Sequence, residues 1–184
     1  FHGADARYAF FNHGSATQMT DLAGFKGTIK PGDILHVGSI SLIDLPGADN
    51  IARFASAQPG DVLVSVDPNV RPGMIRDVDA WRDRMTRILD RADIIKLSID
   101  DLSFLYPDLA PEAFSARCLK NGCALVVVTF GEGGAQLATQ SASARVPAFP
   151  GPVRDTVGAG DTVTGAILSS LTARAIQHAR QLQG

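Results

Sequence analysis

The stretch RDTVGAGDTVTGAIL, residues Arg154–Leu168, decides how the rest of the sequence is interpreted. It places Asp155 and Asp161 on either side of a run of small residues, 158–160, where a helix is expected to begin. Glycine and alanine carry almost no side chain, so their backbone N–H groups can approach a ligand closely. The first turn of a helix has unpaired N–H groups and a partial positive charge, which suits a phosphate. The stretch therefore predicts an anion site at the start of a helix.

Asp161 is the second feature of this stretch. A carboxylate beside a phosphate is a poor ligand for it because like charges repel, but it can accept a proton from a hydroxyl that attacks the phosphate. The alternative is that Asp161 or Asp155 caps the helix and that the glycines form only a tight turn. This stretch alone leaves both interpretations open.

Two other phosphate-binding motifs are excluded. The sequence contains no G-x-x-x-x-G-K-[ST], so a Walker-type nucleotide site is not expected. Neither GAGDTVTG nor GEGGA has the G-x-G-x-x-G spacing of a dinucleotide fold, which argues against a dinucleotide-dependent oxidoreductase.

Strands and helices are expected to alternate along the chain. The strands are apolar over their whole length, which is typical of a parallel sheet covered on both faces in an α/β protein. Ligands of such sheets collect beyond the carboxyl ends of the strands. The expected strands are residues 7–14, 33–42, 61–69, 94–98 and 124–134, then a hairpin over 135–149; the expected helices are 49–60, 77–93, 100–107, 111–122 and 160–177.

The composition narrows the range of partners. The 184 residues suit one domain, and the formal net charge of −2 with interspersed Lys, Arg, Asp and Glu makes nucleic acid and anionic membranes poor partners. Cys118 and Cys123 have no nearby pair of histidines, so we expect two free thiols in a reducing cytoplasm. The four histidines share no spacing typical of a metal site.

The segment DTVGAGDTVTGAIL resembles the second signature, D-T-x-G-A-G-D, of the ribokinase-like carbohydrate kinases, the PfkB group. Four further segments are similar, in the same order, to strand ends of the fructokinases and 2-keto-3-deoxygluconate kinases: DILHVGSISL, VSVDPNVRPGMI, ADIIKLSIDDLSFLYP and VVVTFGEGGAQL. The resemblance implies a three-layer α/β domain with a mostly parallel central sheet. It also implies an ATP-dependent kinase that phosphorylates a primary hydroxyl of a small sugar, with fructose expected first and 2-keto-3-deoxygluconate as the alternative.

The resemblance also implies roles for the residues of the opening stretch. Asp161 would contact the sugar hydroxyl and act as the catalytic base. The backbone N–H groups of Gly158, Ala159 and Gly160 would bind the transferring phosphoryl group. Asp155 and the Val157 carbonyl would bind a monovalent cation, K⁺.

Other matched positions imply the nucleotide site. Thr129, Gly131 and Gly133 would line the nucleotide through close backbone approach, whereas we interpret Gly134 as part of a strand-to-hairpin turn. Lys96 matches a lysine near ATP in the fructokinase-like branch, with an ordinary surface lysine as the alternative.

The remaining matched positions carry open alternatives. Asp101 would tune Mg²⁺ through water, or would form a plain helix N-cap with Ser98. Arg71, with Asn69, would reach a phosphate or a sugar acid, or would form a structural salt bridge. Tyr8 belongs to a remnant of the aromatic β lid, 6–14, which would close over the sugar and provide a homodimer interface; the same aromatic stripe would otherwise be core.

The chain departs from the family at both ends. The sugar-gripping segment that precedes the lid in relatives, and the segment that follows the long helix, have no counterpart here. We therefore expect residues 1–184 to form a single, partial nucleotide-binding domain. A catalytically silent binding module remains the alternative to a kinase.

Overall fold

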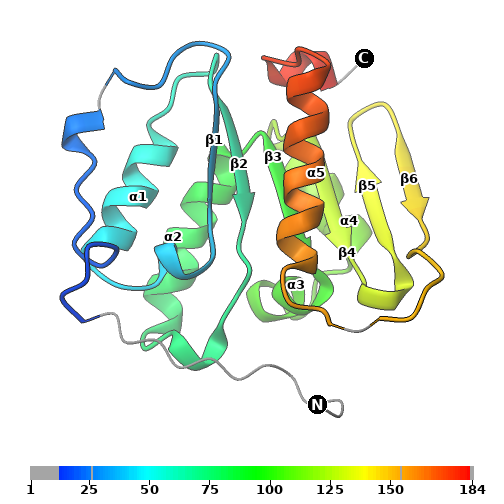
Figure 1. The fold of residues 1–184 in the computed structure, drawn as a ribbon, viewed down its shortest axis with the longest axis horizontal. Helices are drawn as coiled ribbons and strands as arrows, with labels where there is room; N and C mark the ends of the chain where they lie inside the picture. The colour runs from blue at the N-terminus through cyan, green and yellow to red at the C-terminus, as the bar shows by residue number, and fades with distance from the viewer. Residues whose placement is uncertain (1–12, 26, 154, 183–184) are drawn as a thin grey trace.

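The computed structural model describes residues 13–25, 27–153 and 155–182, and its centre is a six-stranded sheet in the order β1-β2-β3-β4-β5-β6 (Figure 1). The first four strands are parallel, and the last two form an antiparallel hairpin beside β4. This mixed sheet confirms the expected α/β class and the expected hairpin. The strands are β1 Ile34–Gly38, β2 Leu63–Asp67, β3 Ile94–Ser98, β4 Leu125–Thr129, β5 Ala135–Ala138 and β6 Ser143–Val146.

Helices cover the two faces unequally. Because side chains alternate along a strand, Ile95 and Val126 point to one face and Ile94 and Val127 to the other. The first pair belongs to the large core beneath α1 to α4, and the second pair packs with α5 (Figure 1). The helices are α1 Gly47–Ser56, α2 Val78–Arg91, α3 Ile99–Leu105, α4 Pro111–Lys120 and α5 Ala159–Ala173.

The helix α2 shows why the sequence folds as it does. The Asp77 side chain accepts a hydrogen bond from the Ala80 N–H at 3.0 Å, which caps the helix. Trp81, Met85 and Ile88 recur on one stripe and are buried, while most of the charged side chains occupy the rest of the helix. Arg84 is the exception: it is buried and pairs with Asp49 at 2.7 Å. The predicted stripe is confirmed.

Several predicted element boundaries are wrong: the strand expected over 124–134 ends at Thr129, and the helix expected over 49–60 spans Gly47–Ser56. Two others have a clear backbone cause. The strand expected over 33–42 ends at Gly38, because Ser39 has a left-handed backbone (φ 54°) and begins a 3-10 turn, Ser39–Leu42. The long helix ends at Ala173 instead of near residue 177. There Ala175 is also left-handed (φ 53°), and the Ile176 N–H bonds to the Leu171 carbonyl at 3.0 Å, as at a helix C-cap.

The lid strand expected over residues 7–14 lies almost wholly outside the described residues.

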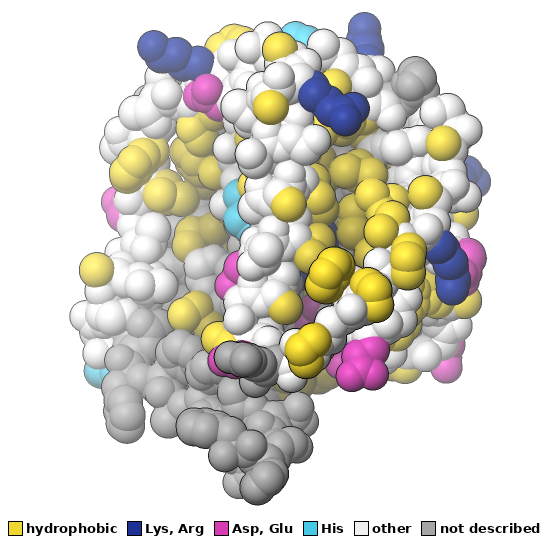
Figure 2. All heavy atoms as spheres, turned by 45° about the vertical axis from the view of Figure 1, so that its right-hand side comes forward, with side chains coloured by type: hydrophobic (Ala, Val, Ile, Leu, Met, Phe, Trp, Pro, Cys, Tyr) yellow, Lys and Arg dark blue, Asp and Glu magenta, His cyan; other side chains and the backbone are white. Residues whose placement is uncertain are grey.

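Beside α5 and the β5–β6 hairpin, Figure 2 shows apolar side chains gathered on the surface. Four apolar residues between β6 and the start of α5, the end of β6 included, are at least half exposed: Val146, Phe149, Val153 and Val157. No described helix combines the length and apolar character needed to cross a membrane.

Candidate active site

The start of α5 is built by a glycine with a left-handed backbone. Gly158 is the N-cap residue at φ 77°, a conformation that side chains disfavour, and it offers no side chain to cap the helix. Asp155 instead accepts a hydrogen bond from the Val157 N–H at 2.9 Å and so closes a turn ahead of the helix. Neither aspartate is therefore the N-cap. The Ala159 N–H donates to the Thr156 carbonyl at 3.1 Å, whereas the N–H groups of Gly160 and Asp161 keep their capacity to bind an anion.

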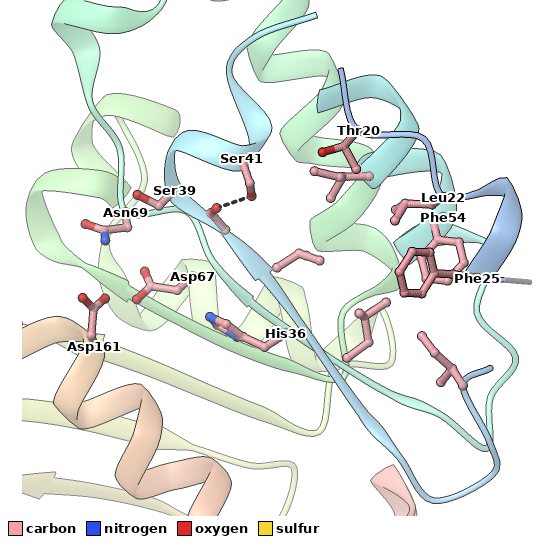
Figure 3. A pocket seen from close by; sticks show the side chains of 15 residues that line it. Thr20, Leu22, Phe25, His36, Ser39, Ser41, Phe54, Asp67, Asn69 and Asp161 are labelled. Atoms are coloured by element: carbon pink, nitrogen blue, oxygen red, sulfur yellow. Dashed lines mark hydrogen bonds between the residues drawn. The ribbon is translucent and has the colours of Figure 1, made fainter. Parts of the chain in front are cut away.

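Cavities lie on both sides of this first turn. The first, here called the Asp161 cavity, has a volume of about 470 Å³ and is lined at one end by Asp161, Asp67, Asn69 and His36 (Figure 3). The second, here called the Thr129 cavity, has a volume of about 430 Å³. Thr129, Gly131, Ala159 and Gly160 line it together with apolar side chains of β4, β5 and α5.

The Thr129 cavity brings together two of the three positions, Thr129 and Gly131, that were expected to line the nucleotide through their backbone. Thr129 is at the end of β4, and Gly131 and Gly133 form the short turn that follows. Gly133 is not among the residues that line the cavity. Gly134 has φ 84°, and a Cβ on it would collide with the Val146 carbonyl oxygen, as expected for the turn into the hairpin. It also lines the cavity, although the sequence did not assign it to the nucleotide.

Lys96 is buried, so the surface-lysine interpretation is wrong. Its Nζ atom donates to the Asp67 Oδ2 atom at 2.8 Å, and both side chains are almost fully excluded from solvent. The same oxygen accepts a hydrogen bond from the Thr164 hydroxyl of α5 at 3.2 Å. A Cβ on Gly160 would lie 2.8 Å from Nζ, so the lysine ammonium lies directly against the first turn of α5.

The loop after β2 holds Asn69 and Arg71. Asn69 has a left-handed backbone (φ 39°), which asparagine tolerates better than most residues. The Arg71 Nη1 atom donates to the Asn69 Oδ1 atom at 2.7 Å and to the Val70 carbonyl at 3.0 Å. The arginine therefore braces its own loop, and its predicted contact with a substrate stays a prediction.

Asp101 forms the cap that the sequence offered as an alternative. Its Oδ2 atom accepts from the Ser98 N–H and hydroxyl at 2.9 and 2.7 Å, and the Ser98 hydroxyl accepts from the Asp101 N–H at 3.0 Å. The Asp101 Oδ1 atom accepts from the Val70 N–H at 2.7 Å. This carboxylate is thus engaged by protein donors, and its predicted role toward Mg²⁺ is not tested by the structure.

The donor sets for metal ions are sparse. Within the described ranges, no three or more His, Cys, Asp or Glu side chains are arranged to hold a metal ion. A Mg²⁺ ion that enters this site would therefore take most of its ligands from nucleotide phosphates and water, as Mg²⁺ commonly does. The Asp155 turn offers one carboxylate for a monovalent cation, and the proposed roles of Asp155 and Val157 remain predictions.

His36 was not assigned a role from the sequence. Its Nδ1 atom lies 3.0 Å from the Ser65 hydroxyl oxygen, and its ring faces the Asp161 cavity (Figure 3). Burial lowers the pKa of His36 below its ordinary value of 6.5, while the negative charges of Asp67 and Asp161 act in the opposite direction. A neutral imidazole is therefore the expected form at neutral pH.

Two other residues of the site were also missed. Asp67 was noted only as part of the segment VSVDPNVRPGMI, and Thr164 had no assigned role. Thr164 lies three residues after Asp161, so both fall on nearly the same side of a helix. That spacing was the available signal, whereas the pairing of Lys96 with Asp67 depends on strands being neighbours in the sheet. Tyr8 lies outside the described residues.

Comparisons with known proteins identify the family of this chain. The model of the pfkB family of carbohydrate kinases matches residues 3–179. The chain belongs to this family. Among curated proteins it is similar to a fructokinase of Rhizobium leguminosarum bv. trifolii, with 36% identity over 90% of the chain and 51% of that relative. It is also 34% identical to fructokinase-2 of Zea mays, over 91% of the chain and 51% of that relative.

A solved structure shows the same fold. The fructokinase of Vibrio cholerae O395, determined with fructose, ADP and calcium ion, has a TM-score of 0.70 and 31% identity, over 82% of this chain and 48% of that one. The ribokinase-like fold implied by the sequence resemblance is therefore confirmed. The chain spans about half the length of the curated relatives it matches.

Proposed function

We propose that this chain supplies the nucleotide-binding and phosphoryl-transfer part of an ATP-dependent sugar kinase whose acceptor is fructose. The observation that carries the proposal is that the first turn of α5 borders both cavities, with Ala159 and Gly160 on one side and Asp161 on the other. A donor nucleotide in the Thr129 cavity and an acceptor hydroxyl in the Asp161 cavity would meet at this turn. The phosphoryl group would then pass beside its N–H groups.

The chain's own residues fit each part of such a transfer. The N–H groups of the first turn of α5 and the nearby Lys96 ammonium would stabilise negative charge on the phosphoryl group. Asp161 would take the proton of the attacking hydroxyl, since its carboxylate points into the acceptor cavity (Figure 3). Positioning and electrostatic stabilisation account for most of the rate in phosphoryl transfer.

The choice of fructose rests on the relatives. The bacterial and plant proteins named above are fructokinases, and the Vibrio structure contains fructose and ADP. No comparison singles out 2-keto-3-deoxygluconate, which stays the second acceptor to test. Mg²⁺ would accompany the nucleotide, and K⁺ would be held near Asp155. A cytoplasmic location and a homodimer remain predictions, the first supported by the free thiols of Cys118 and Cys123.

The test combines binding with turnover. Titration calorimetry of the chain with MgATP measures nucleotide binding, and a coupled assay measures ADP release with fructose, glucose, ribose and 2-keto-3-deoxygluconate. We expect MgATP binding and fructose-dependent ADP release. Binding without release on any sugar would favour a silent nucleotide-binding module, and absence of nucleotide binding would overturn the proposal.

A further inference from the structure

The Asp67 carboxylate joins three elements at the site. Asp67 is the last residue of β2. Its Oδ2 atom accepts a hydrogen bond from Lys96 of β3 at 2.8 Å and another from Thr164 of α5 at 3.2 Å. Asp67 and Thr164 are 97 residues apart in the sequence. The contact therefore depends on the complete fold and does not arise from local structure.

The two partners of Asp67 meet α5 on either side of Asp161. Thr164 follows Asp161 by three residues, and Lys96 lies against Gly160, the residue before it. Apolar contacts between α5 and the sheet come later in the helix, from Ile167, Leu168 and Leu171. The start of α5 is thus held to the sheet by the hydrogen bond from Thr164 to Asp67, with the Lys96 ammonium packed against Gly160.

Charge makes Asp67 necessary for this arrangement. The amino end of a helix carries a partial positive charge, so an unpaired lysine ammonium under it would be repelled. The Asp67 carboxylate offsets that charge and lets Lys96 lie close to Gly160. The other Asp67 oxygen, Oδ1, is buried without a hydrogen-bond partner in the described chain, so Oδ2 carries the polar contacts of this side chain.

We propose that Asp67 is a positioning residue, which holds the first turn of α5 in register with the sheet through Lys96 and Thr164 and thereby fixes Asp161. In Figure 3 the Asp67 and Asp161 side chains lie near each other at one end of the Asp161 cavity. The inference rests on the proposed kinase function for its consequence in turnover. The attachment of α5 to the sheet through Asp67, here called the clamp, can be measured without an activity assay.

The discriminating variant is Thr164→Val, which keeps the shape of the side chain and removes only the hydroxyl that reaches Asp67. Thr172→Val is the matched control, because Thr172 is exposed on the same helix and its hydroxyl bonds only within that helix, to the Leu168 carbonyl. Thr164→Ser keeps the hydroxyl and serves as the rescue variant. Asp67→Asn tests the hub directly, with Thr164→Val as the safeguard if that variant fails to fold.

Hydrogen exchange of residues 159–165, followed by mass spectrometry, is the first readout, and steady-state kinetics is the second. We expect Thr164→Val to speed exchange in the first turn of α5 about tenfold and to lower kcat about tenfold, with KM values within about twofold, because small misplacement of reacting groups costs rate more than binding. Thr164→Ser should recover most of both effects, and Thr172→Val should show neither.

The outcomes separate the two proposals. Unchanged exchange in both Asp67→Asn and Thr164→Val would overturn the positioning role, whatever the activity. If these variants exchange faster but the wild-type chain transfers no phosphoryl group, the clamp is upheld and the kinase function is overturned. A parallel rise in the KM values with an unchanged kcat would overturn the link to Asp161.

Discussion

A methyl group on Gly160 would lie 2.8 Å from the Nζ atom of Lys96, closer than a Cβ atom approaches its neighbours in folded proteins. Lys96 cannot retreat without cost, because its ammonium is buried and paired with Asp67 at 2.8 Å. The absence of a side chain at residue 160 is therefore what brings a cation against the first turn of α5. The same absence leaves the backbone open toward the Thr129 cavity.

Gly160→Ala should accordingly destabilise the chain even though alanine is the better helix former. We expect the free energy of unfolding in urea to fall by about 1–3 kcal/mol, because the methyl group weakens a buried, charge-assisted hydrogen bond. Gly165→Ala is the matched control on the same helix, since a Cβ there meets nothing within 4 Å. That variant should gain about 0.5–1 kcal/mol. Equal gains in both variants would show that Lys96 moves aside freely.

Asp161→Asn tests the assigned base. Asparagine has nearly the same shape but cannot take a proton, so we expect MgATP affinity to stay within about twofold while fructose-dependent turnover falls by at least ~10². Calorimetry gives the first quantity and the coupled ADP assay the second. Asp108→Asn, at an exposed position between α3 and α4, controls for the loss of one negative charge. Near-normal turnover in Asp161→Asn would remove this residue from the mechanism.

The sequence predicted the elements better than their contacts. The strand Ile94–Ser98 and the α2 stripe follow from local apolar patterns, so they were placed correctly. The ends at Gly38 and Ala173 depend on left-handed residues, Ser39 and Ala175, whose backbone conformation no side-chain pattern announces. Periodicity therefore fixes the type of an element more firmly than its boundary.

The site residues likewise fall into those that the sequence predicted and those that it did not. Gly158–Asp161 is contiguous, so its motif is visible in the sequence. The Lys96–Asp67 pair joins β3 to β2, and His36 reaches the cavity only because β1 lies beside β2, so both depend on strand order. The available sign was the position of Lys96 within an apolar strand, which indicates that its side chain is buried. A buried lysine is rarely without a partner, so a partner on a neighbouring strand could have been expected.

The two cysteines provide a test of the fold that is independent of function. Burial is the main cause that raises the pKa of Cys118 to about 11 and that of Cys123 to about 12. At pH 8 the reactive thiolate is then only about a thousandth of Cys118 and still less of Cys123. We expect iodoacetamide to label both slowly in the native chain and rapidly in urea, as read by intact mass. Native labelling as fast as that of a free thiol would contradict the packing around β4 and α4.

His36 should make the fold sensitive to mild acid. Its pKa is lowered by burial, so between the unfolded value of about 6.5 and the lower folded value the unfolded chain binds a proton that the folded chain does not. Stability is therefore full above pH 6.5 and falls as the pH drops below it. Asp67 and Asp161 limit the effect by favouring the imidazolium ion, and Lys96 enhances it.

The measurement is the urea midpoint at pH 7.5 and pH 5.5. We expect the wild type to lose more stability over this interval than His36→Gln, in which the amide can still bond to Ser65 but does not titrate. His178→Gln, at an exposed position near the end of the described chain, should lose as much as the wild type. If His36→Gln shows the same loss as the wild type, the acid sensitivity arises elsewhere, and the imidazole in the Asp161 cavity accepts a proton as readily as it does in water.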